Sequence, residues 1–241
     1  MFPYDSALLD AVGARPRTID DVLATMLSME AFFTDGDGLK WFHRLYRQVT
    51  QAVKECVAAG GFSDPPWLAN LDVQFASLYF EALRQWLSGE RAPGCWRALF
   101  ERRNQASLAR IQFALAGINA HINHDLPVAI GSTCQAAGAA PQHGSHRYAD
   151  YTALNTTLDS LVETAKRELM VRLLGDALPP VSHLEDAVAA WSVAAARETA
   201  WTNSEVLWGL RAAPPLSARY LDGLDGVTAL AGKVLLAPVP L

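Results

Sequence analysis

A helix-length segment, Ile111–Pro127, restricts the folds open to this chain because polar and apolar side chains alternate around it. On a wheel at about 100° per residue, its polar residues form two separated sectors. These are His121, His124 and Asp125 in one sector, and Gln112, Asn119 and Asn123 in the other. A surface helix has one polar face, so this pattern predicts a helix that is surrounded on all sides and whose polar groups have partners. We expect Pro127 to set the end of this helix, because the residue before a proline disfavours helical geometry.

The rest of the chain is also expected to be helical, with glycine and proline residues between the helices. Thr18 can cap a helix that begins at Ile19, and Asp64 followed by Pro65 is a start signal for another. A helix from Tyr148 is expected to run to Gly175, and the spacing of Ser182 and Glu185 is typical of a capping box. Residues 214–241 are expected to form a weaker tail. No strand alternation or repeat is found, so the sequence predicts an all-α, single-domain multi-helix bundle over residues 1–241.

Composition narrows the possible partners. A net charge of −5 gives no general attraction to nucleic acid or to anionic lipid. No apolar run reaches the ~18 residues that a membrane span requires. Three widely spaced cysteines suggest neither a disulfide framework nor a CxxC metal site, which favours a reducing, cytoplasmic setting. A small-molecule ligand or substrate is therefore the expected partner.

Several sequence strings resemble a known family. The strings are NAHINHDLP, DGLKWFHRLYRQVT, DPPWLANLDVQFASLYFEAL and ARETAW with LW a few residues on. Together, over about residues 35–210, they resemble a bacterial family, common in actinobacteria, that is known as a domain of unknown function. The resemblance implies a helical, intracellular protein and brings no assigned chemistry.

The residues themselves suggest a site. His121 and Asp125 are four positions apart and His121 and His124 three, so side chains from one helix can converge. Asp72 falls on the apolar face of its own predicted helix and is the first candidate to join them, with His121, His124, Asp125 and Asp72 as the catalytic set. A divalent metal such as zinc, iron or manganese would need ligands from several helices, for which we consider His121, Asp125, Asp72 and Glu198.

Three interpretations of these residues remain open. Asp125 and His121 can serve structure alone, they can ligate a metal, or a histidine can act as an acid or base with its tautomer fixed by a carboxylate. Asp72 is expected to pair with Arg197 or with a histidine, because an unpaired buried carboxylate is costly. Asn119, Tyr79 and Trp201 are candidates to line a substrate pocket.

Two functional hypotheses follow. The first is an enzyme, either a hydrolase or a biosynthetic cyclase or lyase, that acts on a small, largely apolar substrate at a buried His/Asp centre. The second is a non-catalytic ligand-binding or interaction protein whose buried polar residues are structural. The sequence contains no GxSxG, HExxH or phosphate-binding glycine loop to favour another enzyme class.

Overall fold

The computed structural model describes residues 2–173, 175 and 192–238, and these residues form helices and loops without a strand. The predicted all-α fold is confirmed. The possible capping box at Ser182 and Glu185 lies outside the described residues. No helix in the described part of the chain is both long enough and apolar enough to span a membrane.

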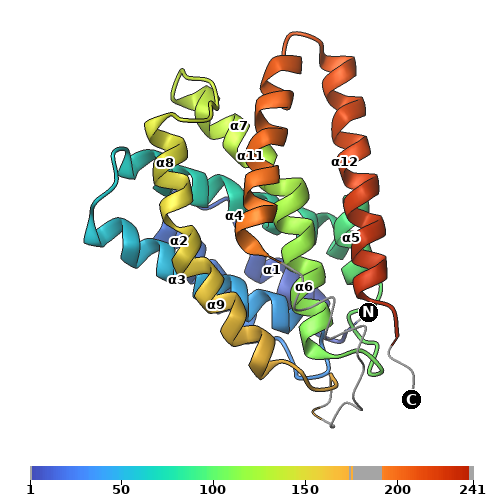
Figure 1. The fold of residues 1–241 in the computed structure, drawn as a ribbon. Helices are drawn as coiled ribbons and strands as arrows, with labels where there is room; N and C mark the ends of the chain where they lie inside the picture. Colours follow the sequence, from blue (N-terminus) through green and yellow to red (C-terminus); the bar gives the residue numbers. More distant parts are fainter. Residues whose placement is uncertain (1, 174, 176–191, 239–241) are drawn as a thin grey trace.

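The first half of the chain contains five helices that precede the central segment (Figure 1). They are α1 (Asp5–Val12), α2 (Ile19–Glu30), α3 (Leu39–Ala59), α4 (Pro65–Leu87) and α5 (Gly94–Phe100). Two of them start where capping chemistry predicts. The Thr18 hydroxyl accepts from the Asp21 N–H at 3.1 Å while the Asp21 carboxylate accepts from the Thr18 N–H at 3.0 Å. Asp64 accepts from the Trp67 N–H at 3.1 Å, with Pro65 at the first helical position.

The second half contains the central helix and the helices packed around it. They are α6 (Arg110–Ala120), the π-helical turn η1 (His121–Asp125), α7 (Leu126–Ala136), α8 (His146–Ala153), α9 (Asn155–Glu168), α11 (Val193–Leu210) and α12 (Pro214–Leu235). Helices α11 and α12 run antiparallel to each other (Figure 1); α12 packs against α6, and α11 packs against α7 and η1.

Helix α6 is enclosed, as its sequence predicts. Every residue from Ile111 to Ala120 is buried, and α3, α5 and α12 pack against the helix. The amide of Gln112 donates to the carbonyl oxygens of Leu235 and Ala237, at 2.8 Å each, and Asn119 donates to that of Thr228 at 2.9 Å. One of the two polar sectors is therefore satisfied by helix α12 and the residues just after it.

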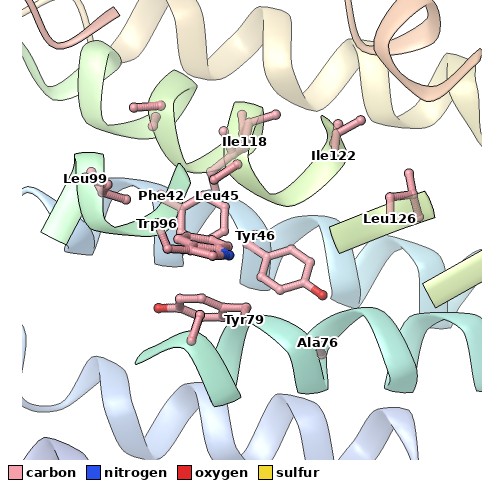
Figure 2. Close-up of a cluster of buried hydrophobic side chains, with 14 of the residues drawn as sticks. Phe42, Leu45, Tyr46, Ala76, Tyr79, Trp96, Leu99, Ile118, Ile122 and Leu126 are labelled. Carbon is pink, nitrogen blue, oxygen red and sulfur yellow. The ribbon is translucent and has the colours of Figure 1, made fainter. Parts of the chain in front are cut away.

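The other side of α6 approaches α3 closely. A Cβ atom at Gly117 would collide with the ring of Phe42, so glycine is required for this contact. Phe42 belongs to an aromatic cluster with Tyr46, Tyr79 and Trp96, which lies between α4 and the α6–η1 segment (Figure 2). The hydrophobic core is thus built directly against the turn that carries the two histidines.

Two expectations about helix lengths are wrong. The helix predicted to run to Gly175 is broken at Leu154 and ends at Glu168, after which the carbonyl groups of Leu169 and Val171 accept from the first N–H groups of α6 at 3.0 and 2.9 Å. These bonds satisfy donors at a helix start that would otherwise lack partners. The weak tail expected from residue 214 is instead a 22-residue helix, α12, packed on α5 and α6.

Candidate active site

The predicted site lies on a π-helical turn. Helix α6 does not end before Pro127 as expected; the backbone stays helical through η1 into α7, with Leu126 at φ −62° and ψ −42°. The Leu126 N–H bonds to the carbonyl of His121, five residues earlier. Proline has no N–H and its ring crowds the carbonyl four residues before it, so a wider turn lets the helix continue past Pro127. Such turns are frequent at functional sites.

A single buried carboxylate organises this turn. Asp125 is 2% exposed, and its Oδ2 atom accepts from the Trp96 indole N–H at 2.9 Å and from His121 Nδ1 at 2.9 Å. Its Oδ1 atom accepts from His124 Nδ1 at 2.8 Å. Although burial opposes the charged form, these histidine bonds hold the Asp125 pKa below its ordinary value. We call Asp125, His121, His124 and Trp96 the Asp125 centre.

The centre fixes the tautomer of both histidines. An ionised carboxylate can only accept, so each imidazole donates from Nδ1, and in the neutral form of the ring Nε2 is a bare acceptor. Burial lowers the pKa of His121 and outweighs the Asp125 hydrogen bond. For His124, burial also disfavours the cation, but the Asp125 hydrogen bond and the charges of Asp125 and Asp225 together raise the pKa. Of the two imidazoles bonded to Asp125, His121 therefore favours the neutral form and His124 favours the cation more than a free histidine does.

The His121 imidazole borders a small apolar pocket. The ring is 2% exposed, stacks on Phe75 with ring centres 3.5 Å apart, and meets the edge of Tyr46 at 4.4 Å. Its Nε2 atom makes no hydrogen bond within the described part of the chain. The adjoining pocket has a volume of about 60 Å³, and its wall includes Leu45, Tyr46, Phe75, Ile122, Leu158 and Val162. We call it the apolar pocket.

The His124 imidazole borders a different and larger space. It lines a cleft of about 860 Å³ between α5 and α12, whose other polar lining residues include Arg91, Arg97, Asp225 and Lys233. We call it the polar cleft. The π turn thus places His121 beside the apolar pocket and His124 beside the polar cleft.

Asp72 and Glu198 form no hydrogen bond or ion pair with the Asp125 centre in the described part of the chain. Asp72 is buried on α4 near Tyr46, and its Oδ2 atom has no hydrogen-bond partner among the described residues. The expected pairing with Arg197 or a histidine is wrong for the described residues, because neither bonds to Asp72. Arg197 donates instead to Asn155 Oδ1 and to the Tyr151 carbonyl, both at 2.7 Å. Burial raises the Asp72 pKa to about 7, so the group is kept partly neutral instead.

Glu198 belongs to a surface cluster on α11. Its carboxylate accepts from His143 Nε2 at 2.8 Å and from the Tyr148 hydroxyl at 2.7 Å, while Glu205 accepts from His143 Nδ1 at 2.8 Å. The structure therefore directs Glu198 to His143 and Tyr148 and not to His121. It brings His121, His124 and Asp125 together and leaves Glu198 out.

The three residues considered for a substrate pocket have other neighbours. The amide of Asn119 is tied to α12 and to Asn123. The Tyr79 hydroxyl lies 3.1 Å from His43 Nδ1, and the fully buried Trp201 packs on Tyr151 with ring centres 5.0 Å apart. None of the three lines the apolar pocket.

Sequence reasoning missed three residues at this site. Trp96 and Cys95 lie in the short helix α5, 25 to 29 residues before the two histidines, and Asp225 lies in α12, more than 100 residues after them. In the described part of the chain, Cys95, His124 and Asp225 form the one group of three or more potential ligands whose donor atoms lie within 4.8 Å of one another. No motif spacing in the sequence connects them.

Comparison with known proteins gives a family but no function. A family model matches residues 19–238 of the 241. The chain belongs to DUF5995, a family of unknown function. The DUF5995 match covers the Asp125 centre and extends through α12, beyond the 35–210 region expected from the sequence strings. No curated protein and no solved structure matches the chain.

Proposed function

We propose that this chain is a cytoplasmic enzyme that transfers a proton on a small, largely apolar substrate, with His121 Nε2 as the general base or acid. The observation that carries the proposal is the arrangement of His121: Nδ1 is held by Asp125 at 2.9 Å, and the buried Nε2 atom has no partner among the described residues. A carboxylate that orients an imidazole in this way is a recurring feature of acid/base catalysis.

The protonation state of His121 suits a base at neutral pH. Burial lowers its pKa, so the imidazole is neutral near pH 7 and Nε2 can accept a proton. If a substrate transfers a proton to Nε2, the adjacent Asp125 carboxylate stabilises the imidazolium that forms. The apolar walls lower the dielectric constant around the imidazole, which strengthens this electrostatic stabilisation.

The size of the apolar pocket limits what can react there. A volume of about 60 Å³ is far below the ~300 Å³ of an ordinary small-molecule site. The pocket therefore accepts only a small reactive end, such as an acetyl group, unless Leu158 and Val162 of α9 move aside. Hydrolysis of a small acyl group fits this limit, and a lyase or cyclase acting on a short apolar chain is the other reaction class that we retain.

The proposal is tested with 4-nitrophenyl acetate as a generic acyl probe. His121 as general base would take a proton from the attacking water, and acetate and 4-nitrophenol would leave. We expect hydrolysis above background to be lost in His121→Gln, and also in Val162→Phe, which fills the pocket without touching the imidazole. His143→Gln, at the surface, is the matched control. Equal rates for wild type and His121→Gln would contradict the proposal.

A non-catalytic ligand-binding role is the second candidate, and one observation favours it. The Phe75 and His121 rings stack at 3.5 Å with planes only 5° apart, a contact that holds the imidazole as part of the core. In that case small apolar probes such as benzene would bind without turnover. Binding detected by chemical-shift changes at Ile122 and Val162, with no hydrolysis in any variant, would favour this second role.

A further inference from the structure

Three potential metal ligands meet beside the polar cleft: His124 and Asp225 line it, and Cys95 is buried behind them. Cys95 comes from α5, His124 from η1 and Asp225 from α12, and their donor atoms lie within 4.8 Å of one another. We propose that Cys95, His124 and Asp225 bind a Zn²⁺ ion. The site uses His124 and not His121, and Asp125 is the one residue that it shares with the acid/base centre proposed above.

The His124 imidazole is already oriented as a metal ligand would be. Its Nδ1 atom donates to Asp125 Oδ1 at 2.8 Å, which leaves the lone pair of Nε2 free. Histidines that ligate zinc almost always donate their other N–H to a carboxylate or carbonyl, which fixes the ring and raises its basicity. Asp125 takes the place of that carboxylate here. It is itself fixed by Trp96 and His121, at 2.9 Å each.

The Asp225 carboxylate is also held in place. Its Oδ2 atom accepts from the Gly94 N–H and its Oδ1 atom from the Cys95 N–H, both at 2.8 Å. Each carboxylate oxygen has two lone pairs, so one remains for a metal. A Cβ atom at Gly94 would lie 2.8 Å from Asp225 Oδ2, so this approach needs glycine at position 94. The same bonds draw Cys95 and Asp225 together.

The donor types select zinc over the hard cations. A thiolate, an imidazole and a carboxylate suit Zn²⁺, whereas Mg²⁺ and Ca²⁺ require oxygen ligands. Zinc distances of about 2.0 to 2.3 Å place tetrahedral ligand atoms roughly 3.3 to 3.8 Å apart. Donor atoms within 4.8 Å therefore reach this geometry by small side-chain rotations. Binding displaces the Cys95 thiol proton to solvent, because the thiolate is the ligand. It also displaces the Nε2 proton of His124 when that imidazole is charged, because only the neutral ring ligates a metal.

The arrangement resembles a catalytic site more than a structural one. Structural zinc sites have four protein ligands, whereas catalytic sites have three and leave a position for water or substrate. Here there are three ligands, and two of them, His124 and Asp225, line a cleft of about 860 Å³. Arg97 and Lys233 also line this cleft. A zinc-bound water in that position would act on polar small molecules in the cleft, in contrast to the apolar end expected beside His121.

The experiment uses Co²⁺ and Zn²⁺ with the full chain purified in the absence of metal. Co²⁺ in a tetrahedral site with a thiolate ligand gives an intense ligand-to-metal charge-transfer band in the near ultraviolet. We expect one equivalent of Co²⁺ to produce this band, one equivalent of Zn²⁺ to abolish it, and a large excess of Mg²⁺ to leave it unchanged. Cys95→Ala should remove the band, whereas Cys134→Ala, which alters another buried free thiol, should retain it.

Two further variants keep the test decisive if Cys95→Ala does not fold. His124→Ala removes a ligand from a partly exposed position, and we expect it to weaken Zn²⁺ at least tenfold in a competition with a chromogenic chelator. His143→Ala, which alters the histidine of the Glu198 cluster, should leave the Zn²⁺ affinity unchanged. The proposal is overturned if wild type binds no stoichiometric Zn²⁺, if Co²⁺ binds without a thiolate band, or if His143→Ala and not His124→Ala abolishes binding.

This test is separate from that of the proposed function. His121→Gln leaves all three proposed zinc ligands in place, so it should abolish hydrolysis of 4-nitrophenyl acetate and retain the cobalt band. A chain that binds zinc but shows no hydrolysis dependent on His121 would support this site and contradict the proposed function. A chain that shows hydrolysis dependent on His121 but binds no zinc would contradict only the zinc site.

Discussion

The indole N–H of Trp96 donates to Asp125 Oδ2 over 2.9 Å, and this bond connects the short helix α5 to the π-helical turn. Trp96 is fully buried and packs on Tyr79 with ring centres 5.1 Å apart. Among the described residues, its indole is the one donor to Asp125 that does not come from a histidine. The carboxylate thus remains partly satisfied when either imidazole changes its protonation state.

Loss of the Trp96 donor should be costly. In Trp96→Phe the buried Asp125 carboxylate loses one of three donors, and we expect the free energy of unfolding to fall by about 1 to 3 kcal/mol beyond the loss of packing. Urea denaturation measures this change in the free energy of unfolding. Trp201→Phe is the matched control, because Trp201 is equally buried and its indole N–H has no partner among the described residues. Equal losses in the two variants would show that the Trp96–Asp125 bond adds nothing.

The close approach of α6 to α3 should not tolerate a methyl group. We expect Gly117→Ala to lower the free energy of unfolding by about 1 to 3 kcal/mol, because its Cβ would collide with the Phe42 ring. Gly131→Ala in α7 meets nothing within 4 Å and should instead stabilise the chain by up to about 1 kcal/mol. Thermal unfolding of both variants measures these two changes in stability. A stabilised Gly117→Ala protein would mean that the two helices are not packed as described.

Asp72 should make the protein less stable as the pH rises. Burial raises its pKa in the folded state to about 7, whereas the unfolded group has an ordinary value near 3.8. Between these values the folded state binds more protons, so this contribution to stability is full below about pH 4 and is lost as the pH rises to 7. We expect Asp72→Asn to have little effect near pH 4 and to stabilise by about 2 to 4 kcal/mol at pH 8. A mutant effect independent of pH between 4 and 8 would contradict this assignment.

The buried Arg103 should be essential to the fold. Its guanidinium binds Asp5 at 3.1 Å and pairs with both oxygens of Asp37, and all three residues are buried. Arg103→Met leaves two carboxylates without their cation, and we expect a loss of about 3 to 5 kcal/mol in guanidinium denaturation. Arg84→Met, which removes an exposed partner of Glu81, should cost less than about 1 kcal/mol. Similar losses in the two variants would show that burial does not amplify the Arg103 interactions.

Much of the fold follows from local patterns in the sequence. Capping by Thr18 and Asp64 sets two helix starts, and the two polar sectors of Ile111–Pro127 require a helix with neighbours on all sides. The sequence of α12 predicts a helix less clearly, because it contains glycines at positions 223, 226 and 232, and glycine has a low helix propensity. Its position depends instead on distant contacts, such as the hydrogen bond from Asn119 to the Thr228 carbonyl.

Only part of the candidate site could be predicted. The spacing of His121, His124 and Asp125 is local, so their convergence was open to sequence reasoning, and all three meet in the structure. The π turn could not be predicted from the sequence. A residue before proline disfavours helical geometry, so the sequence indicates that the helix ends at Pro127, whereas the wider turn lets the helix continue. Residues that join the site from α5 and α12 have no sequence spacing to identify them.

Because one anion fixes two imidazoles that open into separate spaces, the two spaces are not chemically independent. A proton taken up on His121 or a cation bound by His124 changes the electron density available on the same two oxygen atoms, and so changes the basicity of the other ring. At the widened turn before Pro127, the apolar pocket and the polar cleft are therefore connected through a single buried carboxylate.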